Sequence, residues 1–553
     1  MVLQVRSARA DLTAAQSEVS TIQDAIVDGD SATAEKSLAV IQDRARGARS
    51  TMHQPQWAMA ARLPFVGDDV AAVRTVTTAI GDIGDDVLPT LVDLAGQVNT
   101  GAFAPKDGVF DFAALRSTAG DLSVANDSFV RAARPVAEID SDDLLGALRD
   151  PVVEAQDKLA EASATLSRVA SVAEILPDMT DGDHDYLVVF QNNAELRAQG
   201  GLPGAWAQLK IRGGKVSVGQ QGAGSKTLSD VPVEELSAAD IQAFTGDFAR
   251  DFRRTAFTPD TPTAARLQSK LVEKVFGIPT DGVISLDPVT LSYVLKAVGP
   301  IKITKKLTLT SDNAVDLLLS RIYALQPDTE KQDAFFALVT REIFGRIADG
   351  KFDTTELARG LVRGGEEGRI RVWSKDEAVE AKLAKTGVGG AIPFKKSDPA
   401  IGLYLNDLTG AKMNYYLRFS STVKAVSCTE AGVQTYELRM VVGSAAPPPE
   451  SLPSYVIGDG NPPGSMSVSF EVLGPTGGES PIFTSDGKTV PSEAYQVEGR
   501  PGSKIPVTLV RGSVAGITVT MTSPPGHFGP TKFAQTPTIN SGVIPGTIAS
   551  ACS

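Results

Sequence analysis

The chain has 553 residues, a formal net charge of −13 and a hydrophobic content of 42%. At about 100–200 residues per domain, this length predicts three or four domains, each with enough apolar material for a core. The acidic balance excludes a broad nucleic-acid-binding or anionic-membrane-binding surface, which would have to be basic. It does not exclude a small basic pocket for a phosphate.

Residues 1–177 are predicted to be helical throughout. One apolar helix face is formed by Val5, Leu12, Val19, Ile22 and Ile26. Further amphipathic helices, rich in alanine, are expected around 68–98, 112–135 and 141–175. This composition predicts an all-α bundle or stalk that spaces the next domain from a membrane.

The sequence contains no run of about 20 apolar residues and no secretory signal peptide. It starts inside a helical pattern, MVLQVRSARADL. We therefore expect the natural protein to carry an N-terminal membrane anchor that is missing from this sequence.

Residues 178–350 are predicted to form an α/β domain. An apolar strand, DYLVVFQNN, precedes a hairpin with Gly213-Gly214 at its turn. A helix over 260–276 with Thr261 as its cap is followed by a strand, GVISLD, and by a helix that ends at Gly299. Two more helices are expected within 311–348. Strands that alternate with helices predict a mostly parallel sheet.

The last two segments differ from this pattern. Residues 351–399 are predicted to be a connecting helical and loop segment. From residue 400 to 553, β-rich runs such as VQTYELRMVVG and SMSVSFEVLG alternate with Pro- and Gly-rich turns. That pattern predicts an all-β sandwich of immunoglobulin-like size.

The first candidate site follows the first strand, in QNNAELRAQGG. In α/β sheets, ligands bind beyond the carboxyl ends of strands, and an arginine such as Arg197 suits a phosphate. A polar loop with an Arg–Glu pair is the alternative interpretation. The candidate residues are Arg197 for phosphate, Glu195 for a metal ion, and Asn192, Asn193 and Gln199 for substrate.

Two further clusters are candidates. Arg250, Asp251, Arg253 and Arg254 form a charge run that is either an anion-binding loop or a solvated surface. The second cluster combines Arg321 at the end of one helix with residues at the start of the next, namely Asp328, Lys331 and Gln332. Asp328 and Arg321 would also suit the dipoles of these helices without any further function.

The stretches KLVEKVFGIPTDGVISLDPVTLSYVLKAVGPI and SRIYALQPDTEKQDAFFALV resemble LytR–CpsA–Psr envelope proteins. The block NNAELRAQGGLPGAW resembles a largely uncharacterised actinobacterial branch, the domain-of-unknown-function family 4012. The likeness covers about 181–350. It implies an extracytoplasmic α/β phosphotransferase-like domain that holds a polyprenyl-pyrophosphate-linked glycan with a divalent metal and passes the glycan to a wall acceptor.

This resemblance implies roles for individual residues. Arg321 and Asp328 would be catalytic, Arg197, Arg253, Arg254 and Lys331 would bind phosphate, and Gln332 would bind substrate. Glu195 and Asp251 would hold Mg²⁺. The Arg-Asp pair that the LytR–CpsA–Psr enzymes have after the second strand is absent, because the stretch here is SVGQQGAGS. An anion pocket can therefore persist without metal-assisted transfer.

Three functions remain open. The chain is a metal-dependent glycopolymer phosphotransferase, or a non-catalytic glycan-binding or structural protein whose β-sandwich contacts wall polymer, or a glycoside-active enzyme with Glu195 and Asp251 as acid and base. An exported location also affects the two cysteines, Cys428 and Cys552. They are either two separate thiols or one disulfide, and an oxidising compartment favours the disulfide.

Overall fold

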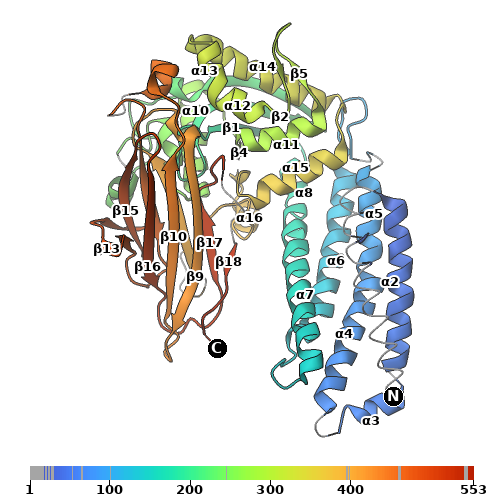
Figure 1. The fold of residues 1–553 in the computed structure, drawn as a ribbon. Helices are drawn as coiled ribbons and strands as arrows, with labels where there is room; N and C mark the ends of the chain where they lie inside the picture. Colours follow the sequence, from blue (N-terminus) through green and yellow to red (C-terminus); the bar gives the residue numbers. More distant parts are fainter. Residues whose placement is uncertain are drawn as a thin grey trace. The chain divides into compact units, whose positions relative to one another are not determined.

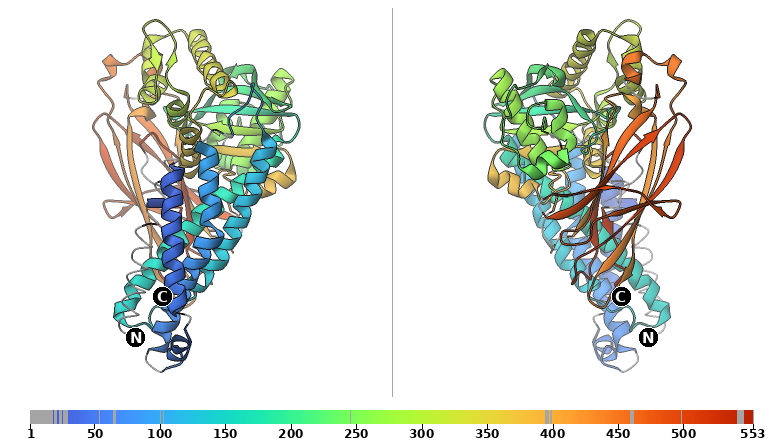
Figure 2. Two further views of the ribbon diagram at one scale, coloured as in Figure 1. Left: turned by 90° about the vertical axis from the view of Figure 1, so that its right-hand side faces the viewer. Right: turned by 90° about the vertical axis from the view of Figure 1, so that its left-hand side faces the viewer.

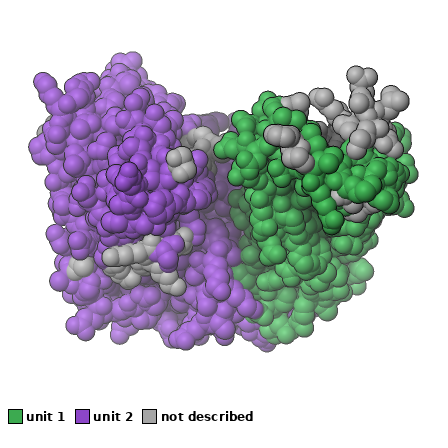
Figure 3. All heavy atoms as spheres, turned by 90° about the horizontal axis from the view of Figure 1, so that it is seen from below, with its two compact units in different colours: residues 1–182, 353–359 green, residues 183–352, 360–553 purple. Residues whose placement is uncertain are grey.

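The structure, a computed structural model, describes residues 30–552 except 53, 64–65, 100, 102, 245, 394–396, 398, 459–461, 498 and 541–545, together with residues 18, 21, 22 and 25. The chain divides into two compact units, 1–182 with 353–359 and 183–352 with 360–553 (Figure 3). Most of the helix predicted over the first 26 residues lies outside the described residues.

The first unit is a helical bundle, which confirms the predicted N-terminal helices. Four long helices lie side by side in both Figure 1 and Figure 2: α2 (Ser31–Met52), α4 (Gly67–Asp86), α6 (Phe112–Ala137) and α7 (Gly146–Ala173). The shorter helices are α3 (Pro55–Ala60), α5 (Leu88–Asn99) and α8 (Leu176–Thr180). No helix within the described ranges is long and apolar enough to cross a bilayer.

The second unit contains a mixed five-stranded sheet in the order β3-β2-β1-β4-β7. Its strands are β1 (His184–Asn192), β2 (Leu202–Arg212), β3 (Lys215–Ala223), β4 (Gly282–Leu286) and β7 (Arg371–Ser374). Among the described strands of this sheet, only β1 and β4 pair in parallel, so the prediction of a mostly parallel sheet is wrong. The reason is that the β2–β3 hairpin must add antiparallel strands, and β7, from the expected connecting segment, also runs antiparallel to β4.

Helices flank this sheet and pack on a core that includes Leu187, Trp206 and Val283. Helix α10 (Thr261–Phe276) is capped by Asp260 rather than by the predicted Thr261, because the Asp260 carboxylate accepts from the backbone N–H of Thr263. The remaining helices are α9 (Ala238–Phe244), α11 (Pro288–Val298), α12 (Ala314–Asp316), a π-helical turn (Leu317–Arg321), α13 (Ile322–Leu325), α14 (Thr329–Ala348), α15 (Thr354–Glu366) and α16 (Glu377–Leu383).

Two sheets form the C-terminal all-β region. One has the order β13-β12-β16-β10-β9 and the other β14-β15-β11-β8-β17-β18. Phe419 and Phe470, from facing sheets, lie 6.2 Å apart between ring centroids. The predicted disulfide is confirmed, since Cys428 is bonded to Cys552. The strands are β8 (Ala400–Asp407), β9 (Leu417–Cys428), β10 (Gln434–Ser444), β11 (Met466–Leu473), β12 (Ile482–Ser485), β13 (Lys488–Thr489), β14 (Glu493–Val497), β15 (Arg500–Leu509), β16 (Val514–Thr522), β17 (Thr531–Gln535) and β18 (Thr547–Ile548).

The α/β domain and the β-sandwich share one hydrophobic core inside the second unit. Phe248 and Leu267 of the α/β domain cluster with Tyr404, Leu473 and Tyr495 of the sandwich. Polar groups at this junction must therefore be paired with one another, because water does not reach them.

Candidate functional site

The loop that follows β1, residues 193–201, is buried along its whole length. It turns back tightly, with the backbone N–H of Leu202 donating to the carbonyl of Glu195 at 2.8 Å. A Cβ on Gly201 would lie 2.4 Å from the backbone carbon of Asn192, so only glycine fits there. Glycine at position 201 is therefore required by the path of the main chain itself.

Asparagine side chains of the sandwich bind the backbone of this loop. The N–H of Leu196 donates to Oδ1 of Asn414 at 2.9 Å, and the N–H of Ala198 donates to Oδ1 of Asn406 at 3.0 Å. The hydroxyl of Thr536 donates to the carbonyl of Ala198 at 2.8 Å. The loop is thus fixed between the two domains instead of lying open beyond the strand.

Arg197, the strongest candidate from the sequence, is a buried cation at this junction. The residue is only 6% exposed, and its Nη1 donates to the carbonyl of Leu196 at 2.7 Å. The guanidinium lies 4.6 Å from the ring centroid of Phe257. Its Nε has no hydrogen-bond partner, and Arg197 makes no ion pair with any described residue. Burial lowers the pKa of Arg197, so the site lacks a fully compensating negative charge.

Glu195 forms a buried ion pair with Lys412, a residue of the sandwich. The Lys412 ammonium lies 4.8 Å from the ring centroids of both Tyr323 and Tyr455. Burial acts to lower the pKa of Lys412, but Glu195 and the two tyrosines raise it above its ordinary value. Asn192 donates to the Tyr323 hydroxyl at 2.9 Å and lies 3.4 Å from Oε1 of Glu195.

Arg197, Glu195 and Lys412 form one charged cluster together with Arg253 and Arg254. The side chains of Arg253 and Arg254 are its more exposed members, at 39% and 41%. Arg253 donates to both carboxylate oxygens of Asp251, at 3.0 and 2.8 Å. This bond is the largest cause that raises the pKa of Arg253, and the charge of Glu195 adds to it. Arg254 makes only long ion pairs, 3.9 Å to Asp251 and 4.0 Å to Asp247.

Asp407 is the third carboxylate of the cluster. Burial raises its pKa to about 6, although Arg197 and the hydroxyl of Thr409 act in the opposite direction. The cluster therefore combines four cations, Arg197, Arg253, Arg254 and Lys412, with three carboxylates, of which one is only weakly acidic.

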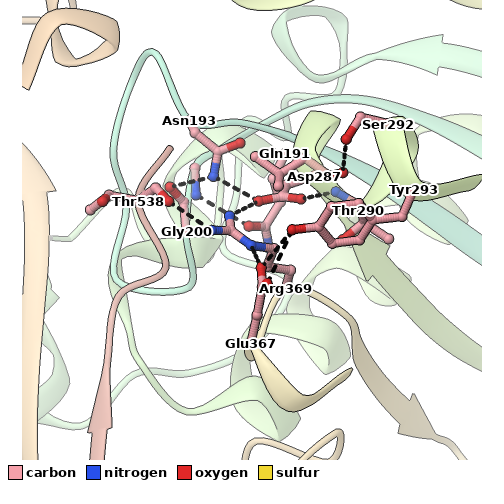
Figure 4. A network of polar contacts seen from close by, with 12 residues as sticks. Gln191, Asn193, Gly200, Asp287, Thr290, Ser292, Tyr293, Glu367, Arg369 and Thr538 are labelled. Atoms are coloured by element: carbon pink, nitrogen blue, oxygen red, sulfur yellow. Dashed lines mark hydrogen bonds and ion pairs between the residues drawn. The ribbon is translucent and has the colours of Figure 1, made fainter. Parts of the chain in front are cut away.

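Asn193 belongs to a different buried network (Figure 4). Its Nδ2 donates to Asp287 and to the carbonyl of Gly200, both at 3.2 Å. Arg369 ties the network together by donating to Asp287 at 2.7 Å, to Glu367 at 2.5 Å and to the carbonyl of Thr538 at 2.8 Å. These bonds fill the space beyond the carboxyl ends of β1 and β4 with protein side chains.

Gln199, predicted to bind substrate, instead holds the loop against the backbone that follows a short 3-10 helix, η2 (Phe252–Phe257). Its amide donates to the carbonyl of Thr258 at 3.1 Å. The residue is 5% exposed. Asn193 and Gln199 therefore position the loop, whereas Asn192 is the candidate amide that faces the charged cluster.

No contact between described residues joins the last group of candidates to the Arg197 cluster. This group consists of Arg321, Asp328, Lys331 and Gln332. Arg321 is half exposed and lies 3.8 Å from Asp316. Asp328 caps α14 by accepting from the backbone N–H of Glu330 at 3.0 Å and forms a loose 3.7 Å pair with Lys331. Gln332 donates to the carbonyl of Gln326 at 2.7 Å. Helix capping accounts for this group as it stands.

The arrangement does not fit a Mg²⁺ ion held by Glu195 and Asp251. Mg²⁺ needs accessible oxygen ligands in octahedral geometry. Glu195 is bonded to Lys412, and both oxygens of Asp251 are bonded to Arg253. Within the described part of the chain, no three His, Cys, Asp or Glu side chains gather as a metal site would require. The same pairing leaves neither carboxylate free as an acid or base.

Sequence reasoning missed Lys412, Tyr455 and Asp407, which the sandwich contributes. Lys412 lies 217 residues from Glu195, so no local spacing could connect them. The only signal was a polar segment, NDLTGAKMN, between two apolar strands. In the helical unit, a surface groove of about 470 Å³ between α6 and α8 is lined by none of the predicted site residues.

A comparison with known proteins finds a match to part of the chain. Residues 181–323 match the model of a family described as a protein of unknown function (DUF4012). This segment includes β1, the buried loop and β2–β4, but neither β7 nor the sandwich. No curated protein and no solved structure matches the chain.

Proposed function

We propose that the second unit binds a lipid-(pyro)phosphate-linked glycan at the extracytoplasmic side of the cell envelope and does not transfer it. The observation that carries this proposal is Arg197, a buried guanidinium without an ion-pair partner among the described residues. Leaving a buried donor of a charged group unsatisfied costs about 1–3 kcal/mol or more. A phosphate oxygen bound there would remove that cost.

The surroundings of the cluster support a ligand that is partly apolar. Tyr455, which packs on Lys412, is 49% exposed. Leu228, also 49% exposed, is paired with Asp251 in an antiparallel bridge, which places both side chains on one face. An exposed apolar rim beside arginines suits the first isoprene units of a lipid and its phosphate.

The envelope location is supported by the Cys428–Cys552 disulfide, because disulfides persist in oxidising compartments. In this proposal a membrane anchor precedes the helical bundle, and the β-sandwich contacts cell-wall polymer. Binding without transfer is favoured over a phosphotransferase because Glu195 and Asp251 are both engaged by cations.

Titration calorimetry with farnesyl pyrophosphate tests the binding. We expect the wild-type protein to bind and the double variant R253A/R254A to bind at least about tenfold more weakly, since each bond to a charged group contributes roughly 1.5–3 kcal/mol. R250A is the matched control, because Arg250 lies in the same segment but donates to the carbonyl of Asp230. A wild-type protein that shows no binding would contradict the proposal.

Incubation with a lipid-linked oligosaccharide and Mg²⁺, followed by mass spectrometry, separates binding from transfer. We expect the lipid-linked substrate to be recovered intact. Release of lipid phosphate would show that the protein is an enzyme.

A further inference from the structure

The carboxylate of Glu195 lies where several cationic and amide groups converge. Lys412 donates to its Oε1, and Nδ2 of Asn192 lies 3.4 Å from the same atom. The Glu195 charge also acts on two arginines: besides the larger effect of Asp251 it raises the pKa of Arg253, and it partly offsets the burial that lowers the pKa of Arg197. This is the environment that proteins provide for a bound phosphate.

The two domains contribute jointly to this environment. The sandwich supplies Lys412 and Tyr455, while the α/β domain supplies Asn192, Arg253 and Tyr323. The Glu195 side chain is 9% exposed and that of Lys412 is 8% exposed. A buried ion pair of this kind contributes little net stability, because desolvation of the two charges opposes their attraction.

We propose that Glu195 is a built-in counter-anion that occupies the position of a ligand phosphate, and that a phosphate or pyrophosphate group binds by displacing its carboxylate from Lys412. This inference rests on the proposed function. It adds that the Glu195 carboxylate pairs with Lys412 when no ligand is bound. A phosphate carries more negative charge than a carboxylate, so it interacts more strongly with Lys412 and the neighbouring arginines.

The proposed exchange moves the Glu195 side chain and leaves the main chain of the loop in place. The backbone on either side of Glu195 is fixed by the bonds from Leu196 to Asn414 and from Leu202 to the Glu195 carbonyl. In the proposed exchange, the Glu195 side chain changes rotamer while these bonds hold the main chain of the loop in place. The half-exposed Arg253 and Tyr455 mark the side from which a ligand would enter.

The variant Glu195→Gln tests the proposal, because it keeps the side-chain volume and an acceptor for Lys412 but removes the competing charge. We expect it to bind inorganic pyrophosphate at least about tenfold more tightly than the wild-type protein, since a like charge at a binding site opposes binding. The double variant E195Q/K412M should lose this gain. Equal affinities of E195Q and wild type would overturn the proposal.

The matched control is Glu471→Gln. Glu471 is also buried at the junction, but its carboxylate accepts from Asn406 and does not face Lys412. Both variants are compared at pH 8, because burial raises the pKa of Glu471 to about 7 and its carboxylate is mainly ionised above that pH. E471Q should leave pyrophosphate affinity unchanged. A gain as large as that of E195Q would show that loss of any junction charge suffices, and would overturn the assignment to Glu195.

A second measurement uses the wild-type protein and does not depend on folding of a variant. Pyrophosphate at saturation should shift the ¹⁵N resonance of the Lys412 ammonium, because its partner changes from carboxylate to phosphate. An unchanged resonance at saturation would contradict the displacement.

Comparing inorganic pyrophosphate with farnesyl pyrophosphate separates this inference from the proposed function. One outcome is that E195Q gains affinity for pyrophosphate but the wild-type protein does not bind farnesyl pyrophosphate. That outcome would support the counter-anion role of Glu195 and contradict the proposed lipid-linked ligand. If the wild-type protein binds the lipid form and E195Q gains nothing, the binding function stands and the counter-anion is wrong.

Discussion

Arg197 combines two properties that are rarely found together, a charge at 6% exposure and no ion pair with a described residue. A buried charge without an ion pair costs several kcal/mol of desolvation, and an apolar side chain of similar length in its place removes that cost. We therefore expect the free energy of unfolding of R197M, measured in urea, to equal or exceed that of the wild type. We also expect R197M to lose farnesyl pyrophosphate binding. A structural arginine would behave differently, because its removal would destabilise the protein.

Two buried acids make the junction sensitive to pH. Burial raises the pKa of Glu471 from 4.5 to about 7 and that of Asp407 from 3.8 to about 6, although Asn406 and Lys504 lower the former and Arg197 lowers the latter. The folded state thus holds these protons more tightly than the unfolded state. Their stabilisation is complete below about pH 4 and is lost as the pH rises through 6 to 7.

Urea unfolding at pH 5 and pH 8 measures this effect. We expect the free energy of unfolding to fall by on the order of a few kcal/mol over this interval, and to fall less in E471Q, which has no proton to lose at that position. Identical pH profiles for E471Q and wild type would show that Glu471 does not contribute.

At the scale of single elements, the loop between β1 and β2 depends on Gly201. An added Cβ would lie 2.4–2.7 Å from backbone atoms of Asn192 and Asn193, which cannot move as a flexible side chain can. We expect G201A to destabilise the protein by roughly 3 kcal/mol or more in denaturant unfolding. G246A is the control, because nothing lies within 4 Å of a Cβ built there. Equal stabilities of the two variants would contradict the tight loop.

Local sequence patterns predicted several elements well. Gly213 and Gly214 have φ of 53° and 80° at the predicted hairpin turn, and Gly299 follows the last residue of α11 as expected. Apolar runs with turn residues between them also identified the sandwich strands. The direction of strand pairing was harder to predict. The short sequence at 371–374 contains no local pattern that predicts its pairing with β4 at the edge of the central sheet.

At the scale of the molecule, the segment matched by the family model is only part of a structural unit. Residues 181–323 lack β7 and all of the sandwich, which covers Phe248 and Leu267. We expect a fragment of residues 183–350 to be expressed without a cooperative unfolding transition and with a poorly dispersed NMR spectrum, because these apolar side chains would meet water. A dispersed spectrum would show that the α/β domain folds alone.

The candidate site was only partly predictable for the same reason. Arg197 stood out because it follows a predicted strand, and Arg253 and Arg254 stood out because they form a charge run just before a predicted turn in the same domain. Lys412 reaches Glu195 only after two domains have packed, and the sequence does not encode that packing in any local spacing. Arg321 and Asp328 were grouped with them by resemblance, whereas their contacts are those of helix ends.

The Cys428–Cys552 bond joins two residues 124 positions apart and closes a ring of chain that contains strands β10 through β18. A protease that cuts once anywhere inside this ring leaves both pieces covalently joined. Such a nicked molecule would migrate as an intact chain on a non-reducing gel and separate into fragments only after reduction. The sandwich, and with it Lys412 on the chain just before the ring, could thus survive surface cleavage in a protease-rich environment without losing its attachment to the α/β domain.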